Sequence, residues 1–239
     1  MTGHFCPHND RSRDNASPAP GTIGGPPVVA PVVARTPLRL VVLGDSIAYG
    51  TGARHPDDAL GPRLSAVLTD DGFDVDLHVL AVPGAVSAHL ADQVRRAGPL
   101  HADLAVVVIG ANDLARFVPV DGATAALAAA VTALQAAGTD VVVVPAPDMS
   151  SVPFVPPAFR AAVRAACAQL QERQGQAAEA AGAVVARIAA EVGTAFAADP
   201  TLFSADRFHP SSAGYAAIAA ALTPAVVTVA RARRDGAAA

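Results

Sequence analysis

The stretch LRLVVLGDSIAYG, residues 38–50, joins a run of aliphatic side chains to a serine. Its first part, Leu38–Leu43, is rich in valine and leucine and predicts a β-strand. Gly44 follows at once, and glycine permits the tight backbone geometry with which a strand can pass into a helix. The stretch therefore predicts a strand-to-helix turn from which the Ser46 hydroxyl projects.

Short aliphatic runs alternate with longer alanine-rich stretches along the rest of the chain. The expected strands are Leu38–Leu43, Val75–Leu80, Leu104–Ile109, Val141–Val144 and Ala183–Ile188. The expected helices are Ala59–Thr69, Val86–Arg95, Thr124–Ala137, Ala158–Ala181 and Ala213–Arg231. The third and fourth strands are nearly continuous Val, Ile and Leu, as strands buried on both faces should be. The alternation predicts an α/β domain with central, parallel strands.

The composition favours one folded domain. Of the 239 residues, 52% are hydrophobic and 16% are charged, which excludes disorder over the whole chain. Residues 1–37 are rich in proline and glycine and are expected to form a flexible leader. We expect the domain to span residues 38–230 and a flexible tail to span residues 231–239.

The charge pattern argues against several partners. The net charge is −4 and every basic residue is arginine, so no strongly positive field is expected to hold nucleic acid or an anionic membrane. No stretch resembles a membrane span or a signal peptide, which favours a cytoplasmic location. His4, Cys6 and His8 are of metal-binding types but lie in the leader, and no Cys-x-x-Cys pair occurs. We therefore expect no metal site, and the oligomeric state stays open.

Four polar segments follow the expected strands. They are residues 44–50, 81–87 and 110–113, and residues 206–210 beyond the fifth strand. Open parallel sheets bind their ligands in the crevice at the carboxyl ends of the strands. The four segments are separate in sequence, yet the fold is expected to bring them together there.

The first and last of these segments hold a candidate nucleophile and its base. A serine hydroxyl is inert until a base takes its proton, and His209 is the histidine expected at the same edge beside a carboxylate. Asp206 lies three positions earlier, so a turn can bring it to the proton-bearing ring nitrogen. Ser46, Asp206 and His209 are thus the candidate catalytic residues.

Attack on an ester builds negative charge on the carbonyl oxygen, and fixed N–H donors must stabilise that charge. The candidates are the backbone N–H groups of Ser46 and Gly84 and the side-chain amide of Asn112. Gly84 has no side chain that would keep a substrate away. These three groups form the expected oxyanion hole.

The four segments together resemble the SGNH, or GDSL, hydrolase family. GDSIAYG, the Gly84 segment AVPGAVS, GAND, and DRFHP followed by SSAGY stand in the family's order, and the resemblance covers about Leu38 to Ala230. It implies a three-layer αβα sandwich with a flavodoxin-like, five-stranded parallel sheet and no metal or organic cofactor. It also implies the same catalytic and oxyanion residues. Many members carry Asn shortly before the glycine of the second segment, whereas Ala81-Val82-Pro83 precedes it here.

Three of these site residues also have a simpler structural interpretation. Ser46 could merely cap a helix, His209 could be a surface histidine, and Asn112 could close a turn. We assign Asn112 to the site and Asp113 to structural support. Asp45 is expected to brace the loop, because a residue adjacent to the nucleophile points elsewhere.

The substrate class follows from one loop. Residues 150–157 read SSVPFVPP, an apolar, proline-stiffened segment that is consistent either with a wall for an acyl chain or with ordinary packing. No long insertion builds a deep lipid tunnel, so we expect a small ester with a short acyl group, cleaved through an acyl-enzyme on Ser46. The alternatives are an acyltransferase or thioesterase with the same residues, and a non-catalytic module that binds carbohydrate or lipid.

Overall fold

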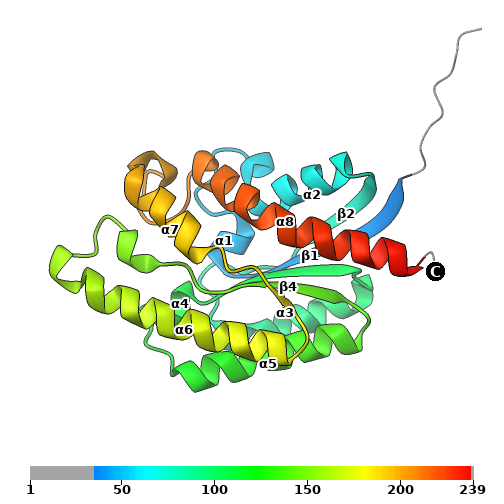
Figure 1. Cartoon of the computed structure of the whole chain (residues 1–239), viewed down its shortest axis with the longest axis horizontal. Coiled ribbons are helices and arrows are strands. Elements are labelled where there is room, and N and C mark those ends of the chain that lie inside the picture. The colour runs from blue at the N-terminus through cyan, green and yellow to red at the C-terminus, as the bar shows by residue number, and fades with distance from the viewer. Residues whose placement is uncertain (1–34, 238–239) are drawn as a thin grey trace, which may run out of the picture. The chain divides into compact units, whose positions relative to one another are not determined.

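Five parallel strands form a single sheet (Figure 1). The structure is a computed structural model that describes residues 35–237. The strands are β1 Thr36–Gly44, β2 Phe73–Val79, β3 Leu104–Val108, β4 Asp140–Val144 and β5 Val184–Val185. They pair in the order β2-β1-β3-β4-β5, the flavodoxin-like order, which confirms the predicted fold class. The expected leader up to residue 34, with His4, Cys6 and His8, lies outside the described residues.

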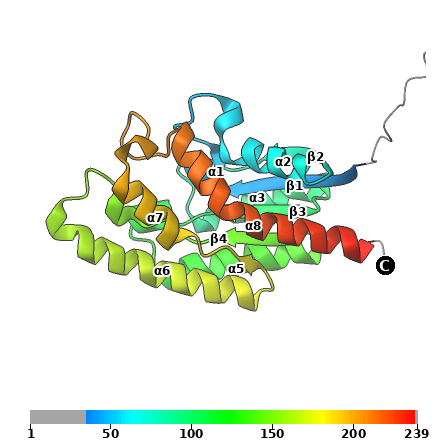
Figure 2. The same cartoon turned by 45° about the horizontal axis from the view of Figure 1, so that its top comes forward.

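Helices cover both faces of this sheet. Their bounds are α1 Ser46–Tyr49, α2 Leu60–Asp70, α3 Leu90–Ala97, α4 Ala111–Ala115, α5 Val120–Ala136, α6 Arg160–Ala180, α7 Ala189–Ala198 and α8 Ser212–Ala237. Figures 1 and 2 show α2, α7 and α8 on one face and α3, α5 and α6 on the other. The domain is therefore a three-layer αβα sandwich.

The alternation of side chains along β1 explains why both faces are covered. Leu40 and Val42 are buried in the core beneath α2 and α8, and Val41 and Leu43 in the core beneath α3 and α5. All four are fully buried. A strand with apolar side chains on both sides can be stabilised only between two helical layers, as the aliphatic runs predicted.

Some elements differ from those expected. β5 has two residues instead of Ala183–Ile188, because the chain turns where the Ile188 N–H bonds to the Ala186 carbonyl. Helix α7 was not predicted, since Gly193 in its middle weakens helix propensity. It forms because packing overrides that weakness, with Phe196 buried against Phe203 in the core.

Helix α8 continues beyond Ala230, where we expected a tail, to Ala237. Arg231 pairs with Asp71 at the end of α2, which holds this extension in place. Among the helices of residues 35–237, α8 alone is long and apolar enough to cross a membrane by length and composition, a test that we expected no segment to pass. In this structure its Leu222 and Val226 are buried in the core of the domain.

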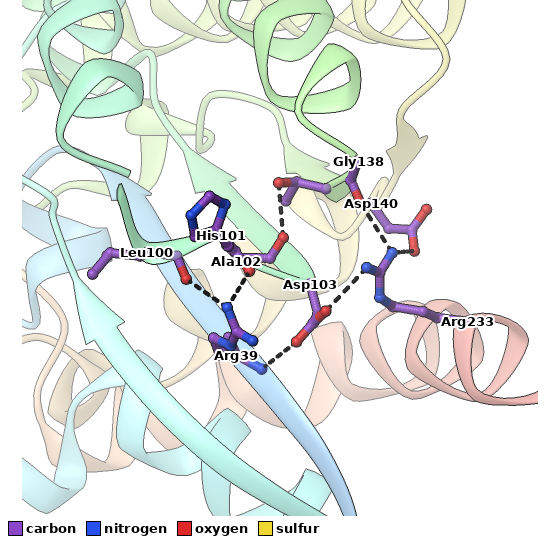
Figure 3. A network of polar contacts seen from close by, with 9 residues as sticks. Arg39, Leu100, His101, Ala102, Asp103, Gly138, Asp140 and Arg233 are labelled. Atoms are coloured by element: carbon purple, nitrogen blue, oxygen red, sulfur yellow. Dashed lines mark hydrogen bonds and ion pairs between the residues drawn. The ribbon is translucent and has the colours of Figure 1, made fainter. Parts of the chain in front are cut away.

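A polar network ties the end of α8 to the amino-terminal edge of the sheet (Figure 3). Arg233 donates to Asp103 and to Asp140, each at 3.0 Å, from its two terminal nitrogens. Asp103 also accepts the Arg39 backbone N–H at 2.8 Å. One guanidinium therefore joins the starts of β3 and β4 to the last helix.

Replacing this guanidinium should loosen the helix end. Arg233→Met leaves both carboxylates without their shared partner, and we expect it to lower the free energy of unfolding by about 1–2 kcal/mol. Chemical denaturation followed by circular dichroism measures the change.

Arg95→Met is the matched control, because Arg95 pairs with Asp92 on the exposed surface of α3. Loss of such a surface pair should cost less than about 0.5 kcal/mol. Equal losses in the two variants would contradict the bridging role of Arg233.

Candidate active site

The turn from β1 into α1 presents Ser46. Gly44 has a φ of +135°, and a Cβ atom there would lie 1.8 Å from the Val108 carbonyl oxygen, so no other residue fits. Asp45 follows and caps α1, because its Oδ1 accepts the Ile47 N–H at 3.0 Å. The bracing role expected for Asp45 is the one seen, and Ser46 stands at the start of the helical turn.

The structure brings Ser46, His209 and Asp206 together in one line of hydrogen bonds. The Ser46 hydroxyl lies 3.0 Å from His209 Nε2, and His209 Nδ1 lies 2.7 Å from Asp206 Oδ2. The carboxylate can only accept, so Nδ1 carries the proton and Nε2 is left to accept from the serine. This is the arrangement in which a histidine can take a proton from a serine hydroxyl.

Hydrogen bonds within the loop before α8 keep the carboxyl group of Asp206 ionised. Its Oδ1 accepts the backbone N–H groups of Phe208 at 2.8 Å and His209 at 2.9 Å, and the Ser204 hydroxyl at 2.8 Å. Burial raises the pKa of Asp206, but the hydrogen bonds from the His209 ring and these groups outweigh it and hold the pKa well below its usual range. Asp206 therefore stays ionised and fixes the ring of His209.

The expected oxyanion donors come from three neighbouring segments. Asn112 lies on α4, and its amide donates to the Ala85 carbonyl at 3.1 Å, next to Gly84. Gly84 has a φ of +81°. Among residues 35–237, the backbone N–H groups of Ser46 and Gly84 have no hydrogen-bond acceptor, and Asn112 keeps a second amide hydrogen. These donors are available to a substrate oxygen.

Backbone contacts support the segment before Gly84, although it lacks the asparagine that is common in the family that the sequence resembles. The Val82 N–H donates to the Gly44 carbonyl at 3.1 Å, and the Ala85 N–H donates to the Val82 carbonyl at 3.0 Å. Backbone hydrogen bonds thus hold this loop beside the turn that carries Ser46.

Two further carboxyl groups lie buried beneath the site. Asp113 accepts both the backbone N–H and the hydroxyl of Ser87 at 3.1 Å, which is a structural role. Burial and the neighbouring Asp113 raise the pKa of Asp45 to about 6, although the Ile47 N–H opposes the shift. The site therefore keeps one carboxyl, Asp206, with a lowered pKa and another, Asp45, with a raised one.

Sequence reasoning missed three buried side chains around the site. Tyr215 is fully buried, and its hydroxyl donates to the Thr51 carbonyl at 2.8 Å and lies 3.4 Å from the Ser46 carbonyl. Gln93 on α3 and Gln174 on α6 are also buried. In the sequence, each glutamine stands at a position of its helix whose neighbouring turns carry apolar residues. The spacing of apolar residues alone does not show whether such a glutamine is buried or exposed.

Two apolar hollows lie beside Phe208, the residue that precedes His209. An open groove of about 550 Å³ lies between α4, α6 and the segment 149–155, and a smaller cavity of about 80 Å³ lies beside Ile47. Met149, Val152 and Phe208 line both. Phe208 stacks on Phe154, with ring centres 5.6 Å apart, and meets the His209 ring edge-on at 4.9 Å. The loop expected to form an apolar wall therefore contacts Phe208, which in turn contacts the ring of His209.

Residues 42–217 match the model of the GDSL-like Lipase/Acylhydrolase family. The GDSL-like esterase Rv1075c of Mycobacterium tuberculosis is 33% identical over 184 residues, which are 75% of this chain and 58% of that protein. This chain thus spans little more than half the length of that relative.

Solved structures with the same fold include TesA, with a TM-score of 0.66 and 21% identity over 80% of this chain and 99% of that one. Another is the acetylxylan esterase Axe2 of Geobacillus stearothermophilus, with a TM-score of 0.64 and 18% identity over 82% of this chain and 96% of that one. The esterase EstA of Pseudoalteromonas sp., inhibited by monoethylphosphonate, has a TM-score of 0.56 and 17% identity over 83% of this chain and 97% of that one.

The raised pKa of Asp45 predicts how stability depends on pH. The folded protein holds the Asp45 proton up to about pH 6, whereas the unfolded chain releases it near 3.8. The stability that protonated Asp45 contributes is therefore complete below pH 3.8 and lost by pH 6. Asp45→Asn should be more stable than the parent protein above pH 6, by up to about 3 kcal/mol, with the difference vanishing near pH 3.5.

Thermal unfolding from pH 3.5 to pH 8 measures this difference. Asp92→Asn, at an exposed position on α3, is the control and should show no such trend. A constant difference between Asp45→Asn and the parent at every pH would contradict the buried, protonated state.

Proposed function

Because the chain belongs to the GDSL-like lipase/acylhydrolase family, we propose that it is a serine hydrolase that cleaves carboxylic esters with small or short acyl groups through an acyl-enzyme on Ser46. The observation that carries this proposal is the line of hydrogen bonds from Ser46 through His209 to Asp206, at 3.0 and 2.7 Å. A serine that was only a helix cap would need neither partner.

In the first half-reaction the Ser46 oxygen attacks the ester carbonyl carbon while His209 Nε2 takes the hydroxyl proton. Asp206 stabilises the resulting imidazolium through its hydrogen bond with Nδ1. The carbonyl oxygen becomes an oxyanion, which the N–H groups of Ser46 and Gly84 and the amide of Asn112 stabilise. His209 then gives its proton to the leaving alcohol, and the acyl group stays on Ser46.

The second half-reaction repeats these steps with water. His209 takes a proton from a water molecule, whose oxygen attacks the acyl carbon, and returns the proton to Ser46 as the acid leaves. The two half-reactions use water and this chain's own side-chain and backbone groups. The esterases Axe2 and EstA share the fold, which supports ester chemistry, and the name of Axe2 supports an acetyl group as one acyl group of fitting size.

The groove beside Phe208 is the proposed site of the acyl group. Its lining is almost entirely apolar, and Phe208 precedes the proposed base directly. A short acyl chain bonded to Ser46 can bury its methylene groups against Phe208 and Val152 there.

Removing either half of the proton relay should stop turnover. Ser46→Ala and His209→Ala should each lower kcat for an aryl acetate by at least about 10³-fold. Asn112→Ala removes one of three oxyanion donors and should lower kcat less, by about 10²-fold.

Circular dichroism of the same variants checks that they remain folded. An Asn112→Ala variant with parental kcat would remove Asn112 from the oxyanion hole. A Ser46→Ala variant that retained turnover would end the proposal.

Narrowing the groove should change acyl-chain preference. Ala166→Trp places an indole in the groove lining and should lower kcat/KM for a hexanoyl ester roughly tenfold relative to an acetyl ester. The ratio of kcat/KM for the aryl hexanoate to kcat/KM for the aryl acetate, in the variant and in the parent, measures this preference.

Ala165→Trp is the matched control, because Ala165 is exposed on the same helix and does not line the groove. If both tryptophan variants treat the two esters as the parent does, the acyl group does not lie in this groove.

A further inference from the structure

Gln93 binds both backbone groups of a single residue, Gly44. Its Oε1 accepts the Gly44 N–H at 2.7 Å, and its Nε2 donates to the Gly44 carbonyl at 2.8 Å. The side chain is 1% exposed, so water does not compete for these groups. A primary amide can accept and donate at once, which a carboxylate or an aliphatic side chain of similar length cannot do.

The place of this contact explains why a side chain is needed there. β2 ends at Val79, whereas β1 runs on to Gly44. Past the end of β2 the chain still donates hydrogen bonds to β1. The Leu80 N–H donates to the Val42 carbonyl at 2.8 Å, and the Val82 N–H donates to the Gly44 carbonyl at 3.1 Å. Among the described residues no backbone carbonyl reaches the Gly44 N–H. Gln93 supplies the missing acceptor where the two strands part.

The Gly44 peptide groups lead directly to the proposed nucleophile. On the other side of β1 the Asp45 N–H donates to the Val108 carbonyl at 3.1 Å. Gln93 and Val108 therefore hold the turn from opposite sides, and Ser46 is the next residue. Its hydroxyl must lie within hydrogen-bond distance of His209 Nε2, while its N–H must face the substrate oxygen.

We propose that Gln93 is a positioning residue for this reaction: its amide fixes the Gly44 peptide groups and thereby places Ser46 against His209. The inference rests on the serine-hydrolase function proposed above. Gln93 touches neither substrate nor reacting atoms. It acts through Gly44, so its loss should slow the chemical step while leaving the affinity for the ester nearly unchanged.

The opposite edge of the sheet provides a matched position with no link to Ser46. The Thr139 hydroxyl is buried and donates to the Ala102 carbonyl at 2.9 Å. Thr139→Val removes this buried hydrogen bond between the starts of β3 and β4 without changing the shape of the side chain. Thr139→Val therefore shows how much the loss of one buried hydrogen bond lowers stability when the geometry around Ser46 is left unchanged.

The test compares Gln93→Met with Thr139→Val by kcat, KM and melting temperature. Both substitutions should lower the melting temperature. Measured well below both melting points with an aryl acetate, Gln93→Met should lower kcat about 10–100-fold and change KM less than about twofold. Thr139→Val should keep the parental kcat and KM.

Three outcomes would overturn the inference. The first is a kcat for Gln93→Met equal to that of Thr139→Val, which would give Gln93 a purely structural role. The second is a rise in KM for Gln93→Met with kcat unchanged. If Gln93→Met does not fold, Gln93→Asn replaces it, with an amide too short to reach both Gly44 groups, and a parental kcat in that variant is the third.

Failure of the proposed function itself looks different. In that case the parent protein fails to hydrolyse the ester, or Ser46→Ala hydrolyses it equally well, whatever residue stands at position 93.

Discussion

The parallel pairing of β1 with β2 as far as Val42, and with β3 as far as Gly44, decides where the other parts of the site can lie. Gly44 pairs with Val108 so closely that a Cβ atom would lie 1.8 Å from the Val108 oxygen. Beyond this point the chains of β1, β2 and β3 leave the sheet at the same edge. Ser46, Gly84 and Asn112 meet there because of strand order, although they are far apart in sequence.

Two carboxyl groups near this edge differ in the hydrogen bonds that they accept. Asp206 accepts from the His209 ring, two backbone N–H groups and Ser204, which together outweigh burial and lower its pKa. Asp45 accepts the Ile47 N–H but is more deeply buried and lies near Asp113, so its pKa rises. The same functional group therefore serves as a permanent anion beside His209 and as a cap beneath Ser46.

Much of this arrangement could be predicted from the sequence, because strands buried on both faces and glycine-flanked polar segments leave strong local patterns. The runs at Leu38–Leu43 and Leu104–Ile109 and the segments around Ser46 and His209 are of this kind. Helix α7 was missed because tertiary packing overrides weak local propensity. The length of α8 was underestimated because Arg231 and Arg233 find acidic partners only in the folded domain. The role of Gln93 depends on where β1 and β2 end, which no local sequence pattern reveals.

Reaction with a serine-directed ethylphosphonate, followed by digestion and mass spectrometry of the peptides, tests the central claim most directly. The account predicts one phosphonate group per chain, bonded to Ser46, and no label when His209 is replaced by alanine. A label on another residue, or a protein that hydrolyses esters while Ser46 stays unmodified, would contradict it.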